Sequence, residues 1–215
     1  IVSPSSKSSN SNISSNFIIF STNIWFLFLY DIFKRFCSSS KEIEEFREKG
    51  HKFLNKEMTV GEFKKASGGM GVYAHRGGKE FMVRLRVPSG VAGLSLLEEA
   101  YNWAKKYNLE KIHLTTREAI QLHGISIDAV CDIMQEGLTK GIYTRGGGGN
   151  FPRNVALNPL SGVQIGETFD VTPYALASNA HYMSKIYTYN LPRKIKTAFS
   201  NTEEDSAHCT VTDLG

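Results

Sequence analysis

The sequence predicts an α+β protein in which helices cover one face of an antiparallel sheet. Residues 81–87 and 111–125 follow the period of two that is typical of half-buried strands. Residues 94–108 and 127–141 carry apolar side chains at the spacing of amphipathic helices. Strand and helix alternate, so both helices can cover the same face of the sheet. The other face is then polar and basic, and such a face needs a ligand or a partner.

A lead helix over residues 41–57 precedes this unit. Its apolar side chains, which recur among charged ones, are Ile43, Phe46, Phe53 and Leu54. The stretch "ASGGMG" ends that pattern, and the first strand runs to the turn "PSG". The apolar face of the strand consists of Phe81, Val83, Leu85 and Val87. Between them lie Met82, Arg84 and Arg86. Arginines at such positions are mostly exposed or salt-bridged, and we leave the role of these two open.

The segment 111–125 is the most informative strand, provided that its register continues through Glu118. Its predicted apolar face consists of Ile112, Leu114, Ile120 and Leu122. Its predicted polar face consists of His113, Thr115, Arg117, Gln121 and His123. We expect His113 to be structural.

The helices have their own predicted buried stripes. For 94–108 the stripe is Leu94, Leu97, Tyr101 and Ala104. For 127–141 it is Ile127, Val130, Cys131, Met134 and Leu138. A further helix is predicted at 171–187, with Pro173 in its first turn. Residues 191–200 read as a loop entering a strand, and residues 207–215 as another strand.

Composition and the chain ends limit the function classes. The net charge of +4 is too mild to indicate nucleic-acid binding. The three cysteines are far apart, so we expect no disulfide framework, no zinc site and a reducing, cytoplasmic compartment. Residues 1–40 read as a low-complexity and apolar leader. The apolar run 17–33 is short and interrupted, which argues against a membrane anchor. A start without methionine suggests a fragment.

Two glycine clusters raise the question of a nucleotide site. "GMGVYA" (69–74) has dinucleotide-site spacing but lacks the strand before it and the helix after it, so a glycine turn is the better interpretation. "GGGGNFPRN" (146–154) has no Gly-Lys-Ser/Thr ending and is not a P-loop. Its glycines can admit a bulky anion, with Asn150, Arg153 and Asn154 as donors. An anion or cofactor loop and a structural turn both remain open.

Four stretches together resemble the siroheme-dependent nitrite and sulfite reductase family. They are "FMVRLRVPSG" (81–90), "HLTTREAIQLHGI" (113–125), "GGGGNFPRNV" (146–155) and "LPRKIKTAFS" (191–200). The resemblance implies a ferredoxin-like half domain within residues 41–140. It also implies a truncated siroheme and 4Fe–4S domain within residues 141–215.

The resemblance implies a six-electron reduction of sulfite to sulfide or of nitrite to ammonia. Siroheme and a 4Fe–4S cluster are the implied cofactors, and ferredoxin or a flavoprotein is the implied electron donor. The implied catalytic residues are Arg117, Arg153, Lys194 and Lys196. The expected cofactor contacts are Gln121, His123, Gly148, Gly149, Asn150 and Asn154. No residue of this chain is expected to bind a metal.

These assignments agree with the chemistry of the residues. Arginine binds oxyanions through its planar fork, and lysine can transfer protons. Lys194 and Lys196 are two apart, so on a strand they point the same way. The family's cluster cysteines are expected downstream, so we expect the 215-residue chain alone to show no reductase activity. A precorrin-processing relative and a non-catalytic module that binds tetrapyrrole or docks a redox partner remain alternatives.

Overall fold

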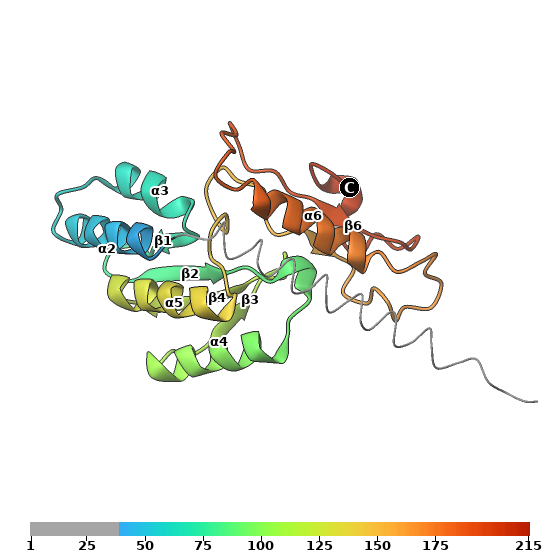
Figure 1. The fold of residues 1–215 in the computed structure, drawn as a ribbon, viewed down its shortest axis with the longest axis horizontal. Coiled ribbons are helices and arrows are strands. Elements are labelled where there is room, and N and C mark those ends of the chain that lie inside the picture. Colours follow the sequence, from blue (N-terminus) through green and yellow to red (C-terminus); the bar gives the residue numbers. More distant parts are fainter. Residues whose placement is uncertain (1–38) are drawn as a thin grey trace, which may run out of the picture.

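The computed structural model describes residues 39–215, and in it the chain forms an α+β fold with a four-stranded antiparallel sheet (Figure 1). The strand order is β1-β2-β4-β3. The strands are β1 (Val72–Ala74), β2 (Phe81–Leu85), β3 (Ile112–Leu114) and β4 (Ile120–Ile125). The predicted fold class is confirmed. Strand β1 was not predicted, because it is only three residues long and follows a glycine turn, so it shows no clear apolar alternation.

Four helices accompany the sheet: α2 (Ser40–Leu54), α3 (Val60–Gly68), α4 (Leu94–Lys106) and α5 (Ile127–Lys140). Helices α4 and α5 pack on the sheet, and α2 packs against α5 (Figure 1). Helix α2 begins with a capping box between Ser39 and Glu42, and α5 ends at Gly141 in the left-handed conformation. The helices predicted at 41–57 and 127–141 are confirmed within a few residues.

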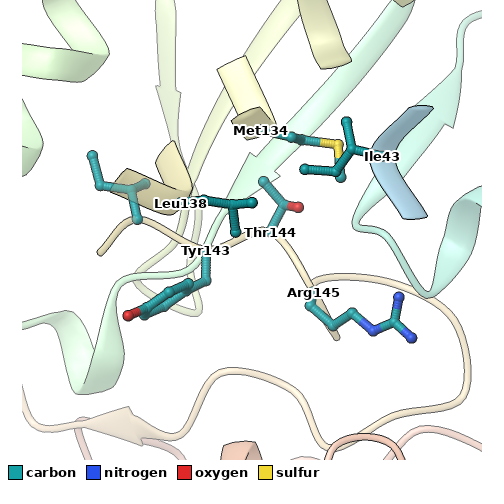
Figure 2. Close-up of a pocket in the computed structure, with 7 residues that line it drawn as sticks. Ile43, Met134, Leu138, Tyr143, Thr144 and Arg145 are labelled. Atoms are coloured by element: carbon teal, nitrogen blue, oxygen red, sulfur yellow. The ribbon is translucent and has the colours of Figure 1, made fainter. Parts of the chain in front are cut away.

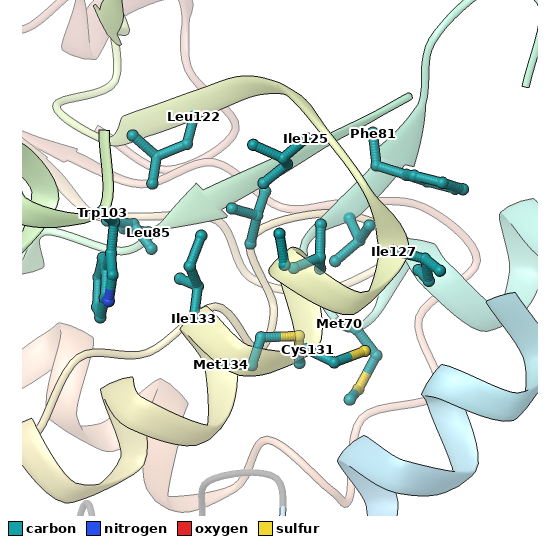
Figure 3. Packing of buried hydrophobic residues seen from close by; sticks show 14 of the residues in the cluster. Met70, Phe81, Leu85, Trp103, Leu122, Ile125, Ile127, Cys131, Ile133 and Met134 are labelled. Atoms are coloured by element: carbon teal, nitrogen blue, oxygen red, sulfur yellow. The ribbon is translucent and has the colours of Figure 1, made fainter. Parts of the chain in front are cut away.

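The main core lies between the sheet and its helices (Figure 3). Leu85 and Leu122 of the sheet pack with Trp103 of α4 and Ile133 of α5, and all four are almost fully buried. Burying each such side chain stabilises the fold by about 2 kcal/mol. This face of the sheet is therefore fixed by apolar packing.

The cross-strand pairing shows which residues share each face of the sheet. Val72, Val83, Leu122 and Ile112 lie side by side on the core face. Arg84, Gln121 and His113 lie side by side on the polar face, as the alternation predicted.

The C-terminal region adds a small sheet and one helix. Strand β5 (Ala156–Leu157) pairs in parallel with β6 (Ala198–Phe199), and α6 (Thr172–Ser184) packs beside them. Two 3₁₀ turns, η1 (Pro88–Gly90) and η2 (Cys209–Val211), complete the described elements. The helix predicted at 171–187 is confirmed.

The single strand predicted at 111–125 is wrong, because this segment is a hairpin. Glu118 has a φ of 57°, and its N–H donates to the carbonyl of Thr115 at 2.9 Å, so the chain reverses there. Strands β3 and β4 consequently pair with each other. Leu114, predicted to be buried, is 71% exposed.

Two further predictions are corrected. In α4, Leu94, Leu97 and Tyr101 are exposed, while Ala100 and Trp103 are buried, because the Trp103 indole packs into the core and donates to Glu136 at 2.6 Å. At the last position of α2, Leu54 is also exposed.

The strand predicted at 207–215 is a turn. The Asp205 carboxylate accepts from the N–H groups of Cys209 and Thr210, at 2.6 and 2.9 Å, and curls the chain into η2. Only Leu214 pairs in this segment, with Thr197.

Within residues 39–215, no helix is both long and apolar enough to cross a membrane. The apolar run 17–33 lies outside the described residues.

Candidate functional site

A cleft of about 480 Å³ opens on the polar face of the sheet. Its walls come from β1, from β2 and the residue after it, from the β3–β4 hairpin, from the glycine loop (residues 146–149) and residues 153–154 that follow it, and from the extended segment 194–196. Six of its lining residues are cations, and none is a carboxylate; the cations are Arg84, Arg86, Arg117, Arg153, Lys194 and Lys196. We call this the cationic cleft. Glu118 and Asp213 lie close enough to act on the charge of Arg117 but do not line the cleft, so cations outnumber the nearby carboxylates and the charge of the cleft favours anions.

The glycine loop forms one wall through close backbone packing. Gly146 and Gly149 have φ values of 69° and 64°, which favour glycine. A side chain at Gly148 would overlap both the carbonyl oxygen of Gly68 and the hydroxyl group of Tyr73. The loop is therefore a packed structural element, in contrast to a flexible linker.

Replacing Gly148 with alanine is expected to lower the free energy of unfolding by about 2 kcal/mol, because its Cβ has no space. The matched control is Gly61→Ala in α3, where a Cβ meets nothing within 4 Å. That variant should be neutral or stabilising by up to about 1 kcal/mol. Urea unfolding followed by circular dichroism measures both. Equal stability of the two variants would contradict this account of the loop.

Two arginines bind the loop carbonyls. Arg84 Nη1 and Arg153 Nη1 donate to the carbonyl oxygen of Gly147, at 2.5 and 2.7 Å, and Arg153 Nη2 donates to that of Gly149 at 2.9 Å. A guanidinium has five N–H donors, so Arg153 retains donors beyond these two bonds, and the Tyr73 hydroxyl group beside it takes part of that capacity. Burial lowers the pKa of Arg84, although arginine stays charged.

Arg117 projects from the hairpin and joins two segments. Its Nη2 donates to the carbonyl oxygens of Asn154 and Thr197, at 2.9 and 2.8 Å. Those bonds use both Nη2 hydrogens and leave Nη1 for a ligand. Burial lowers the pKa of Arg117. Among the described residues, the buried Nε atoms of Arg117 and Arg153 have no hydrogen-bond partner.

Lys194 and Lys196 line the cleft from one side, as their spacing predicted. Lys194 is exposed and Lys196 is half-buried. The intervening Ile195 forms a parallel bridge with Pro152, which places both lysines beside the glycine loop. The four residues predicted as catalytic thus lie around one cleft, and their chemical roles remain predictions.

The predicted cofactor contacts separate into two groups. Gln121 and Asn154 line the cleft, and Asn154 Nδ2 donates to the carbonyl oxygen of Val87 at 2.6 Å. Gly149 and Asn150 instead line a neighbouring hollow of about 510 Å³ beside α3.

His123 and Gly148 line neither opening among those described. His123 lies behind Gln121, and the Gly148 backbone packs on Tyr73.

Several residues that line the cleft had no predicted functional role, among them Arg84, Arg86 and Tyr73. Arg84 and Arg86 were left open, and Tyr73 was not considered. Burial alone would raise the pKa of Tyr73, but hydrogen bonds from the N–H of Gly149 and from the Arg153 side chain, together with the charges of Arg153 and Arg84, lower it below its usual value. No local pattern marks Tyr73, because its position depends on the folded glycine loop.

The described residues offer no ligand set for an iron–sulfur cluster. Cys131 lies in the core, where burial raises the pKa of its thiol to about 12. Cys209 lies in η2, away from the cationic cleft. Among residues 39–215, no group of three or more His, Cys, Asp or Glu side chains is placed to hold a metal ion.

A smaller hollow lies between α2, α5 and residues 142–145 (Figure 2). Ile43 and Met134 point toward one another inside it, and its volume is about 10 Å³. That volume holds about one water molecule, so the hollow is a packing defect of the core.

The fold and the cleft together define an α+β protein with a cation-lined cleft on one face of its sheet. Residues 73–138 match the family described as "Nitrite/Sulfite reductase ferredoxin-like half domain", and residues 148–215 match "Nitrite and sulphite reductase 4Fe-4S domain". The chain belongs to the nitrite and sulfite reductase family.

Characterised relatives are similar over part of their length. A ferredoxin–nitrite reductase of Synechococcus elongatus is 29% identical over 140 residues, which are 62% of this chain and 27% of that protein. A ferredoxin-dependent sulfite reductase of Mycobacterium tuberculosis is 29% identical over 130 residues, 60% of this chain and 23% of that protein. The chain thus spans about a quarter of the length of these relatives.

The solved structure of the Mycobacterium tuberculosis NirA protein has the same fold over 78% of this chain and 34% of its own. The TM-score is 0.63, and the sequences are 21% identical.

Proposed function

We propose that this chain is the N-terminal part of a siroheme- and 4Fe–4S-dependent oxidoreductase, which reduces sulfite to sulfide or nitrite to ammonia with six electrons. One observation carries the proposal: six cations from four chain segments line one cleft without any carboxylate. Siroheme is rich in carboxylates and both substrates are oxyanions, so this donor set fits both. Residues 41–140 and residues 141–215 would form the two walls of the cationic cleft.

The residues have distinct proposed tasks. Arg117 and Arg153 bind anionic oxygens through their free N–H groups, because a guanidinium fork matches that geometry. Lys194 and Lys196 donate protons to the oxygens of the bound anion, and exposed Lys194 is reprotonated from solvent. Gln121 orients the anionic groups through its remaining N–H. Asn154 donates to the carbonyl oxygens of Val87 and Arg117 and so holds the hairpin that carries Arg117 in place. When bound, siroheme would supply electron transfer to the substrate.

The cluster and the electron donor belong to the complete reductase in this proposal. The described residues do not fit a cluster, so we assign it no ligand here. The named relatives use ferredoxin, and we propose ferredoxin as the donor, with a flavoprotein as the alternative.

Product analysis of the complete reductase tests this proposal. With reduced ferredoxin as donor, we expect sulfide from sulfite or ammonia from nitrite. A precorrin-processing enzyme would release neither product and would convert a precorrin. A non-catalytic module would bind siroheme, seen in its absorption spectrum, without turnover. Either result would contradict the proposed function.

A further inference from the structure

A chain of hydrogen bonds leads away from the cationic cleft behind its lining. Only one orientation of the Gln121 amide fits its neighbours, because the Arg84 guanidinium has donors and no acceptor. In that orientation Gln121 Oε1 accepts from Arg84 Nη2 at 2.6 Å and from Arg84 Nε at 2.9 Å. Gln121 Nε2 then donates to His123 Nε2 at 3.0 Å. Arg84 thereby fixes which group donates and which accepts in each of these hydrogen bonds.

The same donor and acceptor pattern extends through the imidazole rings of His123 and His75. Because His123 Nε2 accepts a hydrogen bond, a neutral His123 carries its proton on Nδ1. That N–H faces His75 Nε2 at 3.2 Å, so His75 carries its own proton on Nδ1 as well. His75 Nδ1 lies 3.8 Å from a carboxylate oxygen of the exposed Glu80. The hydrogen bonds therefore lead from Arg84 in the cleft to His75, and the exposed Glu80 lies beside the far nitrogen of that ring without a hydrogen bond to it.

The surroundings of His123 favour its neutral form. Burial lowers the pKa of His123, and the nearby His75, His113, Lys111 and Arg84 lower it further. The His113 ring is stacked on the His123 ring, with centroids 5.8 Å apart. Glu80, next to His75, is the acidic group at the end of this chain. At neutral pH the acceptor on His123 Nε2 is thus retained.

We propose that His123, supported by His75, is a positioning residue that holds Gln121 in the orientation which fixes Arg84 in the cleft, and that protonation of His123 releases this hold. A protonated His123 has two donors and cannot accept from Gln121. The amide must then turn and present its NH₂ group to the guanidinium. Arg84 also donates to the carbonyl of Gly147, so its release affects the glycine loop. The inference rests on the proposed function in treating the cleft as an anion site.

The first test determines the tautomers of the histidines and does not depend on ligand binding. Nitrogen-15 NMR of the chain, with His75→Gln and His123→Asn for assignment, should show that His123 is neutral at neutral pH and carries its proton on Nδ1. Gln121→Ala removes the donor to His123 Nε2 and should abolish this preference in His123. A His123 protonated at Nε2, or cationic at neutral pH, would overturn the proposal.

The second test measures the affinity for inorganic sulfate, which keeps its charge across this pH range. In the unmodified chain, affinity should stay constant through the ordinary range of histidine titration and fall only at lower pH, because the pKa of His123 is lowered. His123→Phe should lose affinity about tenfold at neutral pH, because Arg84 loses its support. His123→Asn keeps an acceptor and cannot be protonated, so it should recover most of the affinity without the acid decline.

His181→Gln, at an exposed histidine of α6, is the control and should keep the acid decline. An acid decline that persists in His123→Asn would overturn the positioning role. If the unmodified chain bound no sulfate at any pH, the anion site of the proposed function would be contradicted. The NMR measurement of the histidine tautomers would then still test the role of His123.

Discussion

Replacing Arg86 with methionine is expected to lower the free energy of unfolding by about 3 kcal/mol. Arg86 is 3% exposed. Its guanidinium donates to the carbonyl oxygens of Pro152 and Arg153, at 3.1 and 3.2 Å, and to Asn179 Oδ1 of α6 at 3.1 Å. Methionine fills similar space without donors, so these acceptors lose their partner in a buried setting.

Urea unfolding measures this loss, and the unfolding slope should stay unchanged if only stability differs. Arg193→Met is the matched control, because Arg193 is exposed and lies outside the cleft lining. We expect that variant to stay within about 0.5 kcal/mol of the parent chain. If Arg86→Met were as stable as Arg193→Met, Arg86 would not join the sheet to the C-terminal region.

Replacing Arg153 with alanine in the reductase proposed above is expected to reduce kcat by about 10²- to 10³-fold. Its guanidinium lines the cleft and retains N–H donors after bonding the glycine loop. Charge that accumulates on the bound oxyanion would lose a fixed cation. The measurement is steady-state reduction of sulfite or nitrite, with circular dichroism to show that the variant is folded.

Arg153→Lys is the informative companion variant. Lysine keeps the charge but cannot bond two loop carbonyls and an anion through one planar fork. We expect its kcat to lie between those of the parent and the alanine variant. Unchanged kinetics in Arg153→Ala would remove Arg153 from the proposed catalytic set.

Much of the fold was predictable from local periodicity. Helix α5 and strand β2 follow their apolar patterns, and the capping box at Thr59 and Glu62 is a local signal that would also have found α3. The hairpin was not predictable, because the positive φ of Glu118 occurs without a glycine or an Asn-Gly signal. Helix α4 buries a different face from the predicted one because Trp103 packs into the core, and this packing depends on tertiary contacts that the local pattern does not show.

Within each segment, the sequence predicted which side chains of the candidate site share a side. It did not predict which segments come together to form the site. The spacing of Lys194 and Lys196 predicted their common side. That these lysines meet Arg117 and Arg153 depends on long-range pairing, such as the bridge between Pro152 and Ile195, and the family resemblance was the only sequence signal for it. Arg86 is buried because the C-terminal region covers it, which no strand pattern reveals.

The most direct measurement of the central claim is the affinity of this chain for siroheme, followed by absorption titration. The double variant Lys194→Gln, Lys196→Gln removes two cations from the cleft, and its matched control Lys64→Gln, Lys65→Gln removes two from the neighbouring hollow. We predict that the cleft variant binds about a hundredfold more weakly, while the control binds like the parent chain. Equal binding by all three, or a loss only in the control, would contradict the assignment of the cationic cleft.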